Sequence, residues 1–367
     1  MNKSIFDGER ILITGGTGSW GTELVKLLLS VSKPKEIRIY SRGEHKQVDM
    51  KRRFHKYSCM RYITGDVRDK NRLLMSTKNI DYIFHLAALK HVPICEENPW
   101  EAVLTNIIGT QNVIESAITN GVKKVVDVST DKAVDPLNLY GVTKACGEKL
   151  MTSANLMDTK TRFVCVRGGN VLGTNGSVIP LFIQQIKKTN AITITDLSMT
   201  RFLMRVRDAV KLVLTAAERS IGGEVFVMKM PSCKIADLAD VMIKRLGNSK
   251  TQVKIIGMRP GEKLLEVLVS RYEKANTIEL DEYFVVLPSI HLPHLKNSYH
   301  KKTNTTPFPD NEYNSMNTQV LTQPEIEHLL ENDGWFTSNN NDDWFDGLSK
   351  SDLGKIFEVE GWKNEKT

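Results

Sequence analysis

Short apolar runs alternate with longer amphipathic segments along the first part of the chain. The run RILIT at residues 10–14 passes through GGTGSWG into ELVKLLLSV, whose apolar residues recur at helical spacing. Similar strand-like runs, each separated from the next by a helix-length segment, follow at residues 36–40, 60–67, 81–88 and 123–130. Strands that alternate with helices predict parallel βαβ units. We therefore expect an α/β fold built on a doubly wound parallel sheet.

The alternation becomes less regular from residue 168 onward. The segment GGNVLGTNGSVIPLF is rich in Gly and Asn, and shorter strand and helix patterns continue to about residue 330. This change predicts a sheet domain at 1–167, followed by a smaller C-terminal lobe at 168–330 that mainly binds substrate.

Two further segments stand out from this pattern. Residues 331–367 break all periodicity but contain three of the five tryptophans, Trp335, Trp344 and Trp362. We interpret this stretch as an appendage of unknown role, which either docks on another surface or forms a loosely packed tail. The segment at 100–120 is helical in pattern and apolar on most sides, so we expect it to be buried or shared with another subunit.

Composition is that of an ordinary globular chain, with 41% hydrophobic and 25% charged residues and no apolar run of membrane-spanning length. The N-terminus, MNKSIFDGER, lacks the features of a secretory signal, so we expect a cytoplasmic protein. The net charge of +7 is spread along the chain and suits small anionic ligands better than nucleic acid. The five cysteines are scattered and His91 has no companion ligands, so we expect neither a disulfide framework nor a metal site.

Three glycines mark the first strand-to-helix junction. Gly15, Gly18 and Gly21 have the spacing GxxGxxG directly after a strand and at the opening of a helix. Glycine permits the dihedral angles of such a turn and the close approach of backbone to a pyrophosphate, which the positive helix N-terminus attracts. The spacing predicts a Rossmann-like dinucleotide-binding turn, with a purely structural turn as the alternative.

The end of the second strand indicates which nicotinamide cofactor would bind. An acidic residue there would hold the ribose hydroxyls of NAD, but the strand ends in Tyr-Ser-Arg. Ser41, Arg42 and Lys46 instead suit a 2′-phosphate and favour NADP, unless Arg42 is a solvated surface charge. Asp66, after the third strand, is placed to accept from the adenine amino group or to cap a helix.

Tyr140 and Lys144 are four residues apart, and no other tyrosine of the chain has a lysine at that offset. On a helix they share one face. The ammonium would lower the pKa of the phenol, so that a phenolate can remove a hydroxyl proton while the carbon beneath gives up hydride. The pair lies ten residues past a strand that ends in Ser129 and Thr130, which strengthens the prediction of an oxidoreductive site.

Taken together, these motifs resemble a known family. TGGTGSWG, HLAA, STDKA and YGVTK are similar to extended short-chain dehydrogenases/reductases acting on nucleotide-activated sugars, over residues 8 to about 330. The segments STDKA, NLYGVTK, AALKHVP, SVIPLF, ITD..MTRF and IIGMRPGEKL resemble most closely the inverting UDP-N-acetylglucosamine 4,6-dehydratases, which open pseudaminic acid synthesis. Asp131-Lys132 is the informative pair, because 4-epimerases need only the hydroxyl residue, Tyr and Lys, and retaining dehydratases carry Asp-Glu.

The resemblance implies roles for the pair. Lys132 would take the C5 proton and return one on the opposite face, Asp131 would protonate the departing 6-hydroxyl, and Thr130 would hold the C4 oxygen. A lysine acts as a base near neutral pH only if its pKa is lowered, and we expect burial, Lys144 and the cofactor ring to lower it. The alternative is that Asp131 caps the following turn and Lys132 is a surface charge.

The motifs and the resemblance give three sets of predicted site residues. The catalytic set is Thr130, Asp131, Lys132, Tyr140 and Lys144. The cofactor-binding set is Gly15, Thr17, Gly18, Ser19, Trp20, Gly21, Ser41, Arg42, Lys46, Asp66, Val67, Lys90, Tyr140 and Lys144. The substrate-binding set is Lys90, Asn170, Val171, Arg201, Arg259 and Glu312, with a structural ion pair as the alternative for Arg201. The chain departs from the family's pattern at Gly168, usually aromatic, and at Asn175, usually arginine.

The resulting hypothesis is an NADP-dependent UDP-N-acetylglucosamine 4,6-dehydratase that inverts C5 and recycles its tightly bound cofactor. A UDP-hexose 4-epimerase is the enzymatic alternative, and a non-catalytic NADP or nucleotide-sugar sensor is the alternative from another class. The resemblance also implies a homo-oligomer, either a dimer through the long central helices or a hexamer. We expect no nucleic-acid or membrane partner.

Overall fold

A computed structural model gives the structure of the protein. The structure describes residues 4–157, 160–174, 177–280, 282–292, 295, 298–299 and 306–336. Three residues singled out from the sequence, Asn175, Trp344 and Trp362, lie outside the described residues.

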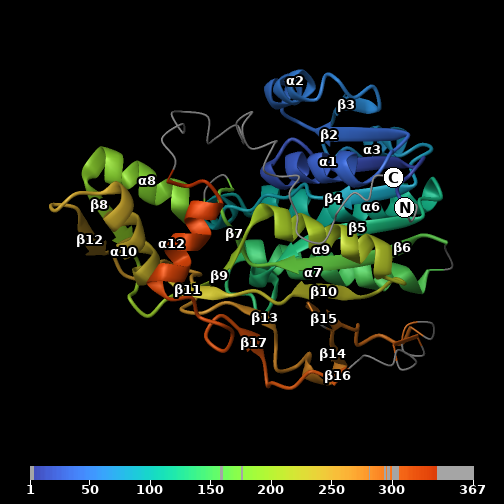
Figure 1. The fold of residues 1–367 in the computed structure, drawn as a ribbon. Coiled ribbons are helices and arrows are strands. Elements are labelled where there is room, and N and C mark those ends of the chain that lie inside the picture. The colour runs from blue at the N-terminus through green and yellow to red at the C-terminus, as the bar shows by residue number, and fades with distance from the viewer. Residues whose placement is uncertain are drawn as a thin grey trace, which may run out of the picture.

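Within the described residues, a sheet of ten strands forms the centre of the molecule (Figure 1). Its parallel core consists of β1 (Arg10–Thr14), β2 (Glu36–Ser41), β3 (Met60–Thr64), β4 (Tyr82–His85), β5 (Lys124–Thr130), β6 (Arg162–Gly168) and β10 (Val225–Met228). Antiparallel strands β15 (Tyr283–Val286), β14 (Thr277–Glu279) and β16 (Thr306–Pro307) extend one edge. The order is β16-β14-β15-β10-β6-β5-β4-β1-β2-β3, so the first six strands of the chain have the Rossmann order 3-2-1-4-5-6.

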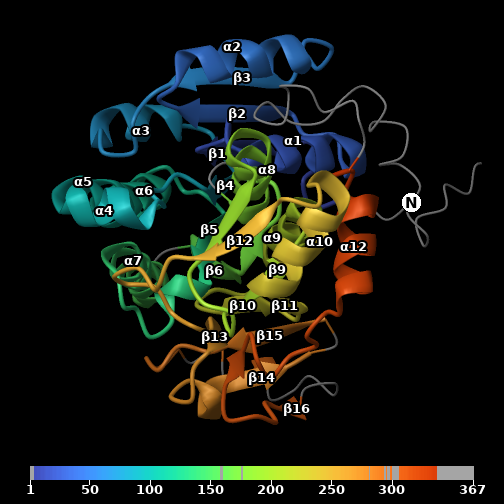
Figure 2. The ribbon, with the colours of Figure 1, turned by 90° about the vertical axis from the view of Figure 1, so that its left-hand side faces the viewer.

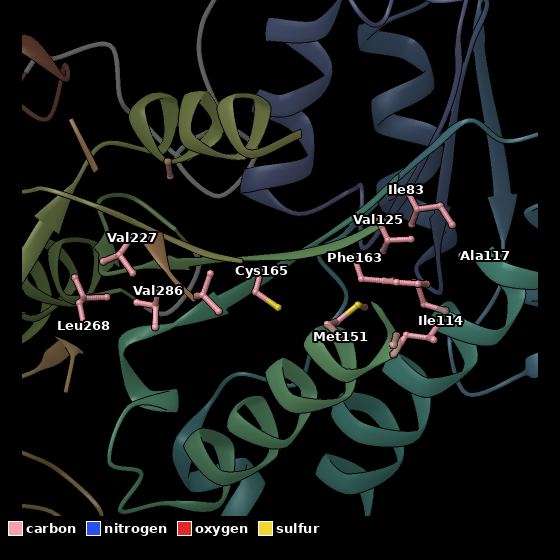
Figure 3. Close-up of a cluster of buried hydrophobic side chains, with 14 of the residues drawn as sticks. Ile83, Ile114, Ala117, Val125, Met151, Phe163, Cys165, Val227, Leu268 and Val286 are labelled. Atoms are coloured by element: carbon pink, nitrogen blue, oxygen red, sulfur yellow. The ribbon is translucent and has the colours of Figure 1, made fainter. Parts of the chain in front are cut away.

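Helices cover both faces of this sheet (Figure 2). They are α1 (Ser19–Val31), α2 (Glu44–Arg53), α3 (Lys70–Ser76), α4 (Val92–Glu97), α5 (Pro99–Val103), α6 (Gly109–Thr119), α7 (Leu139–Ser153) and α9 (Val206–Arg219). Neighbouring residues of one strand point to opposite faces. Val125 therefore packs with Ile114 of α6 and Met151 of α7 (Figure 3), whereas Val126 belongs to the cluster that includes Leu28 of α1. Burial on both faces explains why these strands read as continuous apolar runs.

The predicted strands at 60–67 and 81–88 are shorter in the structure, because their last residues form loops at the carboxyl edge of the sheet. The predicted helix at 100–120 consists of α5, a π-helical turn at Leu104–Ile108 and α6. Its inner side is buried, while Trp100 and Ile108 are 64% and 40% exposed.

A second group of elements packs around a core of its own. It comprises β7 (Asn170–Val171), α8 (Val178–Thr189), β8 (Ala191–Ile194), β9 (Thr200–Met204), β11 (Ser232–Lys234), α10 (Ile235–Leu246), β12 (Gln252–Ile255) and α12 (Gln323–Asn332). Two short strands, β13 (Val267–Val269) and β17 (Tyr313–Asn314), pair with each other nearby. The segment 168–330 is thus shared between this lobe and the central sheet, since β10, β14, β15 and β16 extend the sheet.

Trp335, from the predicted appendage, is part of the lobe's core. Only 5% of its surface is exposed, and its indole nitrogen donates to Asp333 Oδ2 at 2.8 Å. The ring lies against Gly173, where the Cβ atom of any larger residue would come within 2.3 Å of the indole Cζ2. Residues 331–336 therefore anchor the chain on the lobe.

Trp335→Ala should destabilise the protein by about 3–5 kcal/mol, because it leaves a cavity between α12 and the Gly173 loop. Urea denaturation measures this change. Tyr272→Ala serves as a control and should change stability by less than about 0.5 kcal/mol, since Tyr272 is 78% exposed. An equal, small effect of both substitutions would show that Trp335 does not anchor the lobe.

Candidate active site

A cleft of about 830 Å³ opens at the carboxyl ends of the parallel strands. This is where ligands bind in open α/β sheets, and the volume is within the usual range for small-molecule sites. Among the predicted cofactor residues, those that line the cleft are Gly15, Thr17, Gly18, Ser19, Trp20, Gly21, Ser41, Arg42, Lys46, Asp66, Val67, Lys90 and Tyr140. Thr130, Asp131 and Lys132 line it as well. Lys144 does not line the cleft and is only 2% exposed.

The glycine turn is closely packed and leaves room only for glycine. Gly15 has φ +67°, and a Cβ atom there would lie 2.8 Å from the backbone nitrogen of Ala87. A Cβ atom at Gly21 would lie 2.3 Å from the carbonyl oxygen of Gly16. Gly18 occupies the N-cap of α1, so its position offers the first amides of the helix to a ligand. The turn fits a pyrophosphate group.

Beyond the end of β2, the cleft wall carries exposed cations. Arg42 has a side chain that is 55% exposed, and its Nη1 lies 3.9 Å from Asp66 Oδ2. Ser41 is buried and accepts a hydrogen bond from Gln47 at 3.0 Å. Burial acts to raise the pKa of Asp66, but hydrogen bonds from Arg68 outweigh it and lower the pKa. Asp69, and not Asp66, caps the following helix α3.

The catalytic candidates meet where β5 ends and α7 begins. A 3-10 turn at Asp131–Ala133 follows the strand. Thr130 Oγ1 donates to Asp131 Oδ1 at 2.8 Å, and Lys132 Nζ donates to the same oxygen at 3.1 Å. Asn138 caps α7 by accepting from the amide of Gly141 at 2.8 Å. The side chain of Asp131 is 1% exposed and that of Lys132 24%, so Lys132 is no free surface charge.

Lys132 also contacts Glu266, a residue that the sequence analysis missed. Its Nζ lies 3.4 Å from Glu266 Oε1, and Glu266 is 2% exposed. Burial acts to lower the pKa of Lys132, but the carboxylates of Asp131 and Glu266 outweigh it and raise the pKa. The expected lowering is therefore wrong, because two buried carboxylates outweigh burial and the neighbouring cations.

Glu266 had no signal in the sequence, because it stands in the ordinary helix-like run EKLLEVL and its partner lies far away along the chain. Only the packing of the turn at Asp131–Ala133 against β13 brings the two together. Burial and the nearby Asp131 raise the pKa of Glu266 although Lys132 acts to lower it.

The substrate candidates divide into two groups. Lys90, Asn170 and Val171 line the cleft. Burial, followed by repulsion from Lys132, lowers the pKa of Lys90. The Oδ1 atom of Asn170 is buried and has no hydrogen-bond partner in the part of the chain that the structure describes, so it is an available acceptor.

The other three substrate candidates do not line the cleft. Arg201 donates to the carbonyl oxygens of Thr200 and Lys263, both at 2.8 Å, and its Nε lies 3.6 Å from Glu266 Oε1. Arg259 is exposed on the loop after β12, and Glu312 accepts from Asn314 at 2.7 Å.

All five cysteines are free. Over the described ranges, no three His, Cys, Asp or Glu residues gather as metal ligands. Within the same residues, no helix has the length and apolar character needed to cross a bilayer.

Known proteins resemble this chain over most of its length. The family model described as polysaccharide biosynthesis protein matches residues 11–288. A UDP-N-acetylglucosamine 4,6-dehydratase (inverting) of Campylobacter jejuni subsp. jejuni serotype O:23/36 (strain 81-176) is 47% identical, over 78% of this chain and 85% of its own length. A UDP-glucose 4-epimerase of Rickettsia bellii (strain OSU 85-389) is 43% identical, over 89% of this chain and 97% of its own length.

Solved structures support the same relationship. The X-ray structure of Pen from Bacillus thuringiensis has a TM-score of 0.83 and 40% identity, and the match covers 90% of this chain and 99% of that one. DesIV, a dTDP-glucose 4,6-dehydratase from Streptomyces venezuelae, shares the fold with a TM-score of 0.63 and 21% identity, over 70% of this chain and 86% of that one. The chain belongs to the polysaccharide biosynthesis protein family of extended short-chain dehydrogenases/reductases, and within it to the inverting UDP-N-acetylglucosamine 4,6-dehydratases.

Proposed function

We propose that this protein removes water from UDP-N-acetylglucosamine and inverts C5, giving a UDP-4-keto-6-deoxy-N-acetylhexosamine. The observation that carries the proposal is the contact between Asp131 and Lys132 at the wall of the nucleotide cleft. A 4-epimerase needs no such acid and base pair, whereas removal of a C5 proton and a C6 hydroxyl needs both.

The first step in this scheme is oxidation at C4. Tyr140 accepts the proton of the 4-hydroxyl group, and the Thr130 hydroxyl turns from Asp131 Oδ1 to donate a hydrogen bond to the C4 oxygen. Burial outweighs the ammonium groups of Lys144 and Lys132 and the hydrogen bond with Thr130, so the pKa of Tyr140 is raised and the lowering expected from the sequence is wrong. The ketone at C4 then makes the proton at C5 acidic.

The second step needs an amine base and a carboxylic acid at the same time. Lys132 and Asp131 rest as an ammonium and a carboxylate, with Nζ and Oδ1 3.1 Å apart. Transfer of one proton across this contact produces both required forms without a change in net charge. Lys132 then takes the C5 proton, and Asp131 protonates the 6-hydroxyl, which leaves as water. A proton returned to C5 on the opposite face inverts that carbon.

We further propose NADP as the cofactor. The glycine turn fits its pyrophosphate, and Arg42, Ser41 and Lys46 lie together on the cleft wall where a 2′-phosphate would bind. Held by these residues, NADP would supply the acceptor for the C4 hydride and the donor of the same hydride to C6, so the cycle would have no net redox change.

A UDP-hexose 4-epimerase is the second candidate, and the name of the Rickettsia relatives favours it. Its product would keep the 6-hydroxyl group. A non-catalytic sensor on this fold would leave every UDP-sugar unchanged.

We also propose a homo-oligomer, formed through the helices around the exposed side chains of Trp100 on α5 and Val142 on α7. The role in pseudaminic acid synthesis and the cytoplasmic location that the sequence implies stay predictions.

Lys132→Ala should bind NADP and UDP-N-acetylglucosamine normally but lose dehydration by about 10²–10⁴-fold, because it lacks the base. Mass spectrometry of the sugar detects the loss of water, and Lys149→Ala, an exposed lysine on α7, is the matched control. Product formation by Lys132→Ala at the control's rate would remove Lys132 as the base. A product of unchanged mass from the wild type would favour the epimerase.

Arg42→Ala should weaken NADP binding by about 10–100-fold and leave NAD binding unchanged, since it removes charge-assisted hydrogen bonds to phosphate. Calorimetry with each nucleotide measures both affinities. Lys51→Ala, an exposed cation on α2, should change neither affinity. Equal losses for NADP and NAD would contradict a 2′-phosphate contact.

Gly168 makes room for Trp20 at the cleft wall. A Cβ atom at Gly168 would lie 3.2 Å from Cη2 of Trp20, so a larger residue at 168 requires the indole ring to shift. Gly168→Phe should displace the indole and raise KM for UDP-N-acetylglucosamine about tenfold. Addition of Trp20→Ala should restore part of the loss, measured by steady-state kinetics. Independent, additive losses would show that the two side chains do not compete for space.

A further inference from the structure

A buried ion pair lies beneath the catalytic helix. Asp127 follows Val125 by two residues on β5, so it points into the layer between the sheet and α7 where Val125, Phe163 and Met151 pack (Figure 3). Its exposed fraction is 0%, and that of Lys144 is 2%. The Nζ atom of Lys144 lies 3.2 Å from Oδ2 and 3.4 Å from Oδ1 of Asp127.

A carboxylate in such a layer is costly unless a cation balances it. From β4, His85 Nε2 lies 4.0 Å from Asp127 Oδ1, and burial lowers the pKa of His85 to about 4, so this histidine is neutral. Its two nitrogens are hydrogen-bonded to the hydroxyls of Thr14 and Thr110. From β6, burial raises the pKa of Cys165, so it remains a thiol. Among the described neighbours, Lys144 therefore supplies the positive charge.

The charge of Lys144 also depends on Asp127. Burial acts to lower the pKa of Lys144, but Asp127 outweighs it and raises the pKa. A fully buried lysine without a counter-ion loses its proton near neutral pH. Tyr140, one turn earlier on α7, faces Lys144, Lys132 and Asp131, and depends on the first two for the stability of its phenolate.

We propose that Asp127 is a positioning residue for the reaction, which keeps Lys144 in its ammonium form and fixes it beside Tyr140. Asp127 is fully buried and does not line the cleft, so it acts through Lys144. The inference rests on the proposed function only for the part that Tyr140 plays in catalysis. The charge state of Lys144 follows from the ion pair itself.

Asp127→Asn keeps the shape of the side chain and removes its charge. Lys144 should then become a neutral amine at neutral pH, and the pKa of Tyr140 should rise. The ascending limb of the pH profile for dehydration should move to higher pH by about one unit or more. An unchanged pH profile would overturn the proposal.

A double substitution separates this effect from a general disturbance of the core. Asp127→Asn combined with Lys144→Met should be no slower than Lys144→Met alone, because Asp127 acts only through Lys144. If the rate losses of the two single substitutions multiplied in the double variant, the result would contradict the proposal.

A measurement on the wild-type protein covers the case in which Asp127→Asn does not fold. In protein labelled with ¹⁵N-lysine, the Nζ signal of Lys144, assigned by its absence from Lys144→Arg, should be that of an ammonium at neutral pH. A neutral amine would overturn the proposal. This readout needs no substrate, so it remains decisive even if the protein fails to turn over any UDP-sugar.

Discussion

The contact of Lys132 with two buried carboxylates is the interaction on which the proposed chemistry of the cleft depends. Asp131 follows β5 directly, whereas Glu266 stands immediately before β13 and is also in contact with Arg201 of β9. Through Arg201, this cluster of charges joins the end of the central sheet to the lobe. Removal of Glu266 would leave Lys132 with one carboxylate, and removal of Lys132 would leave two carboxylates facing each other. The geometry of the turn at Asp131–Ala133 depends on this balance of charge.

A second lysine is paired with a buried carboxylate beneath the cleft wall. Lys144 has Asp127 as its counter-ion, and the hydroxyl of Tyr140 lies in the field of both lysines. Both lysines of the site are thus held in ion pairs with buried carboxylates. In the proposed scheme, catalysis requires redistribution of protons within these pairs.

Much of the fold and of the site could be predicted from the sequence, because the signals are local. The apolar runs at β1 and β5, the glycine turn and the Tyr140–Lys144 spacing each depend on neighbours within a few residues. Glu266 could not be predicted, since its role arises from a contact across 134 positions with Lys132, as their numbering shows. Arg201 lies in a motif that suggested phosphate binding, yet its guanidinium donates to the backbone around Lys263 and approaches Glu266. The contacts of Glu266 and Arg201 are determined by tertiary packing, which the local sequence pattern does not reveal.

The most direct test of the account is turnover of UDP-N-acetylglucosamine in heavy water, with the sugar followed by NMR. The account predicts a C4 ketone, a C6 methyl group, and deuterium at a C5 centre of inverted configuration, because Lys132 exchanges its proton with solvent between the two faces. A sugar that keeps its 6-hydroxyl and its C5 hydrogen and changes only at C4 would contradict the account.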